Sequence, residues 1–311
     1  MAFQTLIRNF FNALWLLLAW PAIAAAQAEP APPIVDVPWL QERVCSPRLV
    51  VLDLRRSRQN FEAEHIPCAV HSDYYQGGWR ATMNGVENMI PSASRLEALI
   101  GSLGIANDSH VVLVTAALDM FSPAEVARVF VIFRYLGHDN VSIIDGGIGA
   151  WTAAWDNDIE VGPVVPEPAT FTAKPRPDMI ATRAEVEAAI KAGTPLIDMR
   201  GNDHYLGINR TRVVVRPGTI PGAVNLPMTW IVVNDELRFR TPDQLRTLWQ
   251  TAGVPIDAPQ ILFCNSALES SIGWLAANML LGNSQAKLYD GSLAEWSADP
   301  ALPMELKVQL D

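Results

Sequence analysis

The side chain best suited to do chemistry in this sequence is the thiol of Cys264. The apolar run before it, residues 261–263, is typical of a buried strand, and a helix is expected to begin near Ser270. Cys264 is therefore expected at the carboxyl end of a strand, the edge where open α/β sheets bind ligands. Inward-facing loop amides and the positive end of the helix would lower the pKa of the thiol and favour the nucleophilic thiolate.

The chain has three cysteines, an odd number that leaves at least one thiol without a partner in the same chain. Cys45 and Cys68 both lie in the first half and could form a disulfide, whereas Cys264 lies alone in the second half. The alternative is three unrelated buried thiols, because free cysteine is often a core residue. Pairing depends on geometry that the sequence does not give.

Residues 1–26 have the pattern of a secretory signal peptide. Their only charge is Arg8, an apolar run follows over residues 10–23, and three small residues, Ala24 to Ala26, resemble a cleavage site. The alternative is an uncleaved membrane anchor, but the run is shorter than the roughly 20 residues that span a bilayer. We expect a periplasmic or secreted protein with no membrane association after cleavage. The net charge of −10 argues against nucleic acid as a partner.

Short apolar runs alternate with helical patterns along the chain, which is typical of the α/β class. The runs are apolar on both faces, as in a parallel sheet covered on both sides. The expected strands are residues 49–52, 111–114, 141–144, 196–197, 223–226, 260–263 and 287–289. Helix starts are predicted at Thr182 with Glu185, at Thr241 with Gln244, and at a capping box formed by Ser122 and Glu125.

The chain also repeats itself, which predicts two copies of one domain. Asp53 and Asp198, Asp145 and Asp290, and Trp151 and Trp296 are each 145 residues apart. The predicted organisation is a signal peptide (1–26), a first domain (35–160), a proline-rich linker (161–178) and a second domain (179–305). The prolines at 163, 166, 168, 175 and 177 favour an extended linker.

Over residues 35 to 305 the sequence resembles the two-domain rhodanese family, the thiosulfate and 3-mercaptopyruvate sulfurtransferases. The resemblance is carried by Asp198 and Arg200, Tyr205-Leu206-Gly207, residues 220–225, the Cys264 loop, Tyr289-Asp290-Gly291-Ser292 and Glu295-Trp296. It implies two tandem rhodanese-like α/β domains, each a mostly parallel sheet with helices on both faces. The first would be silent, because Thr115 aligns with Cys264. The second would hold sulfur as a persulfide on Cys264, in a loop steadied by Asp198 unless Asp198 is only a cap or turn residue.

Several site positions depart from the family pattern. Ala267 replaces a usual glycine, and His204 replaces a substrate-binding arginine, so that His204 either binds a substrate anion or packs. Glu269 places a carboxylate where a cation or hydroxyl is common, and we expect it to point outward from the first turn of the helix. The candidate substrate-binding or loop-supporting residues are Asp198, His204, Asn265, Ser266, Ala267, Leu268, Glu269 and Ser270.

A nine-residue insert near 207–218 of the second copy holds Arg210, Arg212 and Arg216. It would supply positive charge if it overhung the site, but a solvated loop is the favoured interpretation. The lack of cations in the loop disfavours thiosulfate, a dianion, as the main donor.

The predicted function is a sulfurtransferase that moves sulfur through Cys264 from a small donor to a thiol or cyanide-like acceptor, or from a protein persulfide. The alternative is a binding or sensing protein that kept the fold and lost turnover. A cysteine phosphatase or arsenate reductase is disfavoured, since no arginine ends the loop to bind an oxyanion. No cofactor is expected. No metal site is expected either, because the histidines and cysteines are not spaced as they are in metal-binding motifs.

Overall fold

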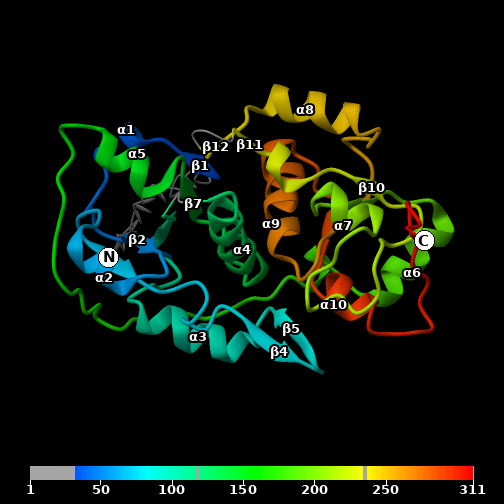
Figure 1. Ribbon diagram of the computed structural model, residues 1–311. Helices are drawn as coiled ribbons and strands as arrows, with labels where there is room; N and C mark the ends of the chain where they lie inside the picture. The colour runs from blue at the N-terminus through cyan, green and yellow to red at the C-terminus, as the bar shows by residue number, and fades with distance from the viewer. Residues whose placement is uncertain (1–31, 117–118, 234–236, 311) are drawn as a thin grey trace, which may run out of the picture.

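Two five-stranded parallel sheets form the centres of two side-by-side halves in a computed structural model that describes residues 32–116, 119–233 and 237–310 (Figure 1). The first sheet has the strand order β1-β7-β6-β2-β3. Its strands are β1 (Ile34–Val35), β2 (Leu49–Asp53), β3 (Ala69–His71), β6 (His110–Val114) and β7 (Val141–Ile144). The signal-peptide prediction for residues 1–26 lies outside the described residues.

The second sheet repeats this order with equivalent strands, β8-β14-β13-β9-β10, and all of its pairings are parallel. The strands are β8 (Ile180–Ala181), β9 (Leu196–Asp198), β10 (Val224–Asn225), β13 (Gln260–Phe263) and β14 (Ala286–Tyr289). The matching orders confirm the two-copy α/β fold, and every strand expected from the sequence is present with bounds that differ by at most one residue.

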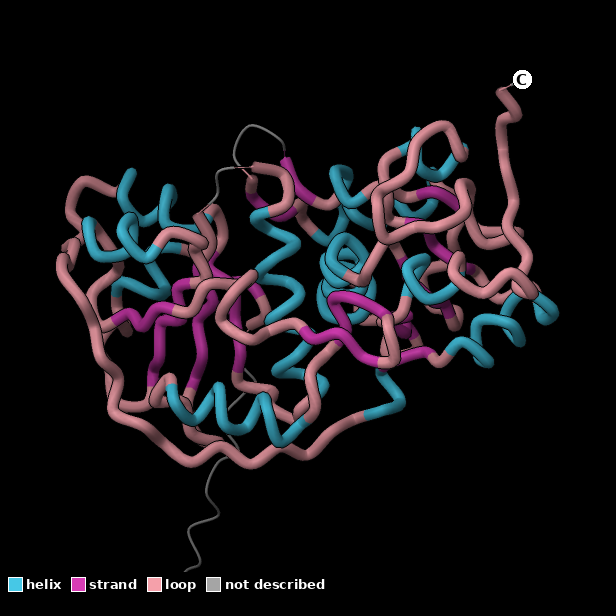
Figure 2. Tube along the Cα trace, turned by 60° about the horizontal axis from the view of Figure 1, so that its bottom comes forward, coloured by secondary structure: helices cyan, strands magenta, loops and turns pink. Residues whose placement is uncertain are grey.

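Two antiparallel ribbons add to the sheets. One is β4 (Ala81–Met83) with β5 (Val86–Met89), and the other is β11 (Val232–Val233) with β12 (Arg238–Phe239). The β4–β5 hairpin leaves the first half and extends toward α10 (Ser292–Trp296) of the second, as both overall views show (Figure 1 and Figure 2). A segment of the first half therefore reaches the second.

Helices cover the sheets. In the first half they are α1 (Val37–Gln41), α2 (Arg58–Ala63), α3 (Ala93–Ser102), α4 (Ser122–Tyr135) and α5 (Gly147–Ala153). In the second they are α6 (Arg183–Ala192), α7 (Asn202–Leu206), α8 (Pro242–Thr251), α9 (Leu268–Trp274) and α10. Helix α9 continues as a π-helix over Leu275–Leu280, and short 3₁₀ turns lie at Pro177–Met179 and Met228–Trp230. No helix of the described ranges is long and apolar enough to cross a membrane.

All three predicted helices begin within a residue of the predicted start, but only two of the three predicted capping boxes are present. Thr182 with Glu185 and Thr241 with Gln244 form complete capping boxes. Ser122, by contrast, is the first residue of α4 rather than its N-cap, which is Phe121. The Asp119 carboxylate accepts the backbone N–H groups of residues 121 and 122 instead. Glu125 forms an ion pair with Arg56 rather than closing a capping box, so its carboxylate is engaged elsewhere.

Helix α4 joins the two halves. Every residue from Ser122 to Phe133 is buried, although the sequence shows only one apolar stripe on this helix. Helix α4 packs against β6 and β7 of its own sheet and also against α9 of the other half (Figure 1). One apolar cluster runs through both halves as a result, and it includes Val126 of α4 and Ile272 of α9.

The proline-rich segment predicted as a linker lies against the first half. The Ala169 amide donates to the Gly101 carbonyl at 2.8 Å, the Lys174 amide donates to the Leu136 carbonyl at 2.8 Å, and Phe171 is buried. The segment is extended, as expected, but its backbone hydrogen bonds and Phe171 fasten it to the surface of the first half.

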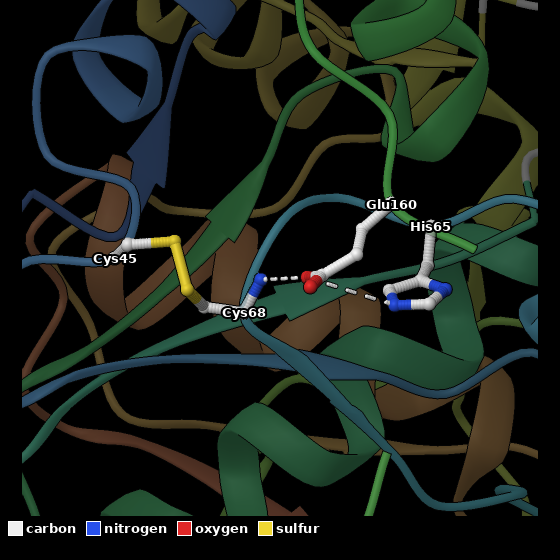
Figure 3. The surroundings of a disulfide bond; sticks show 4 residues. All are labelled: Cys45, His65, Cys68 and Glu160. Atoms are coloured by element: carbon white, nitrogen blue, oxygen red, sulfur yellow. Dashed lines mark hydrogen bonds and ion pairs between the residues drawn. A yellow bond between two sulfur atoms is a disulfide. The ribbon is translucent and has the colours of Figure 1, made fainter. Parts of the chain in front are cut away.

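Cys45 and Cys68 form a disulfide with a Cα–Cα distance of 5.4 Å, so the pairing left open by the sequence is present (Figure 3). Beside it, the Cys68 amide donates to a Glu160 carboxylate oxygen at 2.7 Å, and the same oxygen lies 3.9 Å from His65 Nε2. The disulfide and Glu160 together tie the turn before β3 to the turn between α1 and β2 and to the chain that follows α5.

Removing this disulfide is expected to lower the free energy of unfolding by about 3 kcal/mol, because a cross-link over 23 residues restricts the unfolded chain. Chemical denaturation of a Cys45→Ser/Cys68→Ser variant measures the loss. A reductant should produce the same loss in the unaltered protein and leave the variant unchanged. Equal unfolding midpoints for the variant and the unaltered protein would contradict the prediction.

Candidate active site

Cys264 directly follows β13, at the carboxyl edge of the second sheet, as predicted. Phe263 pairs with Asp198 of the neighbouring strand β9. In the first sheet, Val114 pairs with Asp53 in the same manner and Thr115 comes next. Thr115 and Cys264 therefore occupy equivalent places in the two halves, and only the second carries a thiol.

The sulfur of Cys264 is buried, and both apolar side chains and polar groups surround it. The residue has no solvent exposure and belongs to the apolar cluster that includes Leu262 and Ile272. Polar groups also reach the sulfur, since the Ser270 hydroxyl donates to it at 3.5 Å and the backbone N–H groups of Ser266 and Ser270 hydrogen-bond to it. The expected cradle of loop amides is thus present in part.

The remaining loop amides are held by Ser292, a residue that the sequence did not single out for this role. The amides of Cys264 and Ala267 donate to Ser292 Oγ at 3.2 and 3.1 Å, and the Ser292 hydroxyl donates to the Tyr289 carbonyl at 2.8 Å. The equivalent residue in the first half is Gly147, which has no hydroxyl. The exchange of glycine for serine between the two copies is the signal that points to this residue.

The pKa of the Cys264 thiol is raised to about 12, so the expectation of a lowered pKa is wrong. Burial is the main cause, because it disfavours the charged thiolate, and the negative charge of Glu269 adds to it. The hydrogen bonds from Ser270 and Ser266 act in the opposite direction but do not compensate. The resting site therefore holds a neutral thiol.

Glu269 points inward, so the expectation of an outward side chain is also wrong. The residue is only 8% exposed, and one carboxylate oxygen accepts a hydrogen bond from Asn265 Nδ2 at 3.0 Å. Burial raises the pKa of Glu269, and the charge of Asp198 raises it further. A hydrogen bond with the Cys264 thiol lowers it. Two negative charges in this buried pair would repel each other, so the pair favours carrying only one.

Ala267 and Leu268 shape the turn into the helix. Ala267 has φ = 63°, a left-handed conformation that favours glycine, and Leu268 begins α9. This conformation explains why the family uses glycine here. Ala267 bears a strained backbone next to the thiol, as residues at functional sites often do.

Asp198 ends β9 and pairs with Phe263, the residue before Cys264. Among the described residues, no hydrogen bond joins its carboxylate to the sulfur. Its carboxylate accepts hydrogen bonds from the Arg200 guanidinium at 2.9 and 2.5 Å and from the Thr219 hydroxyl at 2.7 Å, and all three residues are fully buried. Asp53 and Arg55 form the same pair in the first half. Since the first half keeps this pair next to Thr115 rather than a thiol, the main role of the pair is structural.

His204 lies on α7 with a partly exposed side chain, and its closest charged neighbour is Asp203 at 4.0 Å. Among the described residues, no hydrogen bond or ion pair joins the His204 side chain to the Cys264 loop, so the structure does not bring His204 together with the thiol.

The three arginines of the insert are engaged elsewhere. Arg216 donates to the Ser297, Leu302 and Asp299 carbonyls, Arg210 donates to the Val214 carbonyl, and Arg212 forms an ion pair with Glu87 at 2.7 Å. The insert does reach the site, but through a neutral side chain, because the Thr211 hydroxyl donates to Asn265 Oδ1 at 3.3 Å.

Residues of the first half contact the Cys264 loop and the residues that support it. Asn88, on β5, donates to the Ser266 hydroxyl at 3.3 Å, and the Ile90 amide donates to the Asp290 carboxylate at 2.9 Å. Arg128, a fully buried residue of α4, forms an ion pair with Asp290 at 2.5 Å and interacts electrostatically with Cys264. These residues were missed because their role depends on a contact between the two halves.

Comparisons with known proteins agree with this arrangement. The model of the rhodanese-like domain family matches residues 36–154 and 182–299. The chain is 31% identical to the thiosulfate sulfurtransferase of Mus musculus over 85% of this chain and 91% of that protein. It is 30% identical to the 3-mercaptopyruvate sulfurtransferase of Rattus norvegicus, with the same coverage of 85% and 91%.

Among solved structures, SseA from Escherichia coli, described as a 3-mercaptopyruvate sulfotransferase, superimposes with a TM-score of 0.73 and 27% sequence identity. The match covers 84% of this chain and 99% of that one. The likeness therefore includes both halves.

Proposed function

We propose, on the premise that this chain belongs to the rhodanese-like domain family and is a sulfurtransferase, that Cys264 carries the transferred sulfur as a persulfide. The observation that carries the proposal is the position of this free thiol at the carboxyl edge of the second sheet, with the Ser270 hydroxyl and two backbone N–H groups directed at the sulfur. Such donors stabilise negative charge on sulfur at low cost, because they are already in place.

The chemistry has two steps. The Cys264 thiolate attacks the transferable sulfur of a donor, the bond that holds this sulfur breaks, and the leaving group departs with the electron pair. A nucleophilic acceptor, such as a thiolate or cyanide, then attacks the outer sulfur of the persulfide and releases the Cys264 thiolate. Small donors and acceptors are the substrates, and a protein persulfide is a further donor of the same chemistry.

The donor that we propose carries less negative charge than thiosulfate. Residues 264–271 contain no lysine or arginine, and the buried Glu269 contributes a carboxylate. Arg128, the nearby buried cation, is already paired with Asp290. A dianion would therefore meet little compensating charge at the sulfur, whereas a monoanion such as 3-mercaptopyruvate or a neutral persulfide would meet less repulsion.

We also propose that the protein works in an exported compartment. The pattern of residues 1–26 supports this, and so does the disulfide of Cys45 and Cys68, two exposed residues that a reducing cytosol would keep as thiols. Fractionation of cells that express the full chain, with the N-terminus of the product sequenced, tests it. Recovery of a full-length product in the cytosol would overturn it.

Mass spectrometry of the protein after exposure to 3-mercaptopyruvate, thiosulfate and an organic persulfide tests the role of Cys264. One added sulfur atom is expected on the peptide that contains Cys264, cyanide should remove it as thiocyanate, and Cys264→Ser should show neither. No added sulfur on Cys264 with any of the three donors, or unchanged turnover in Cys264→Ser, would overturn the proposal.

A further inference from the structure

Glu269 is a buried carboxylate beside the nucleophile, at a position where the family usually has a cation or a hydroxyl. We propose that Glu269 is the acid–base partner of Cys264: its carboxylate takes the thiol proton as the sulfur attacks a donor and returns that proton to the leaving group. This inference rests on the proposed function, since it assigns the proton transfers of the same site. It makes Glu269 a catalytic residue, because it contacts the reacting thiol.

The carboxylate is held in place by a short chain of polar contacts. The Thr211 hydroxyl donates to Asn265 Oδ1 at 3.3 Å, which leaves Asn265 Nδ2 to donate to Glu269 Oε2 at 3.0 Å. Asn265 and Glu269 are both buried, and Glu269 lies in the first turn of α9, one residue before Ser270. The Ser270 hydroxyl donates to the sulfur at 3.5 Å. The thiol and the carboxylate are thus positioned before any substrate arrives.

The electrostatics favour a single shared proton. The thiol and the carboxyl group hydrogen-bond to each other, and burial raises the pKa of both. Each group also disfavours ionisation of the other, so together they hold one proton and one negative charge. Moving the proton from sulfur to carboxylate forms the thiolate and at the same time removes the charge that would repel it. The high pKa of the isolated thiol is then no obstacle to reaction.

The other ionisable groups around the pair are already engaged. Asp198 of β9 is paired with Arg200, and Arg128 of α4 is paired with Asp290. The Tyr74 phenol is buried, and its pKa is raised to about 12, so it remains neutral. Glu269 is the charged group with the largest effect on the pKa of the Cys264 thiol, and it is the group placed to accept the thiol proton.

The proton balance separates two classes of donor. With thiosulfate, the thiolate forms a bond to the outer sulfur, the S–S bond of the donor breaks, and sulfite leaves as a dianion, so the proton stays on Glu269. With 3-mercaptopyruvate, the C–S bond breaks and the carbon leaves with the electron pair as the enolate of pyruvate, which must be protonated. Glu269 supplies that proton and returns to the carboxylate. The site therefore fits donors whose leaving group needs a proton, namely α-keto thiols and persulfides.

Glu269→Gln tests this inference, with Glu187→Gln on the exposed face of α6 as the matched control. The amide keeps the shape of the side chain but cannot take up a proton. We expect turnover with 3-mercaptopyruvate to fall by roughly 10²–10⁴-fold, the range of general acid–base catalysis. Turnover with thiosulfate should fall by a smaller factor, because that donor needs the base step but not the returned proton, and the control should match the unaltered protein. Glu269→Asp should recover part of the loss. Thermal melting establishes that each variant is folded.

The opposite result would identify Glu269 as a repelling charge only. In that case the Cys264 thiol of the Glu269→Gln variant would ionise more readily, and turnover with both donors would rise. That result would overturn the inference. Equal losses with both donors would overturn it as well. Persulfide formation on Cys264 of the unaltered protein tests the sulfur-carrier role separately from the acid–base role. If Cys264 acquires sulfur but Glu269→Gln has no donor-selective effect, the acid–base role fails and the sulfur-carrier role stands.

Discussion

Replacement of Arg128 by methionine is expected to lower the free energy of unfolding by about 3–5 kcal/mol. Arg128 and Asp290 form a buried ion pair between the two halves, at 2.5 Å, and Arg128 also donates to the Asn88 carbonyl at 3.1 Å. Methionine fills much of the same space but leaves the Asp290 carboxylate buried without its cation, which is the costly part of breaking such a pair. Chemical denaturation followed by tryptophan fluorescence measures the change.

A double variant distinguishes loss of the pair from loss of packing. Arg128→Met/Asp290→Leu removes both charges and should recover most of the stability lost in Arg128→Met, because no unpaired charge then remains. A loss below about 1 kcal/mol in the single variant would contradict the prediction. Sulfur transfer should fall in the single variant too, because Asp290 lies two residues before Ser292, which holds the Cys264 loop.

Replacement of Arg200 by methionine is expected to cost a similar 3–5 kcal/mol. Asp198 and Arg200 are both fully buried, and Arg200 also donates to the Gly218 carbonyl at 2.8 Å. Without the guanidinium, the Asp198 carboxylate retains only the Thr219 hydroxyl and nearby backbone groups as partners. Its uncompensated charge would also raise the pKa of Glu269 further, in the direction that Asp198 already shifts it. Denaturation and turnover with 3-mercaptopyruvate measure the two effects.

The first half offers a matched control for this variant. Arg55 and Asp53 form the equivalent buried pair, with contacts of 3.0 and 2.9 Å, but next to Thr115 rather than a thiol. Arg55→Met should lose comparable stability and, under conditions where it remains folded, keep its turnover. If both variants lost turnover equally, the Asp198–Arg200 pair would have no effect on the site beyond stability.

The sequence alone was sufficient for the features that depend on local patterns. Apolar runs of strand length predicted seven of the ten strands of the two described sheets, because a strand buried on both faces must be apolar along its length. The sequence analysis missed β1, β3 and β8, which are only two or three residues long. Repeated landmarks such as Asp53 and Asp198 revealed the duplication. Cys264 was placed at the end of β13 because a strand-to-helix transition can be read from a few neighbouring residues.

The tertiary structure decided everything that depends on what surrounds a residue. The first-turn position of Glu269 suits a solvated side chain equally well, and only the packing of the loop turns it toward the thiol. The thiol pKa rises instead of falling, because α4 and the β4–β5 hairpin help to enclose the site. Burial and pairing are properties of the assembled halves, and they are not encoded in any short stretch of sequence.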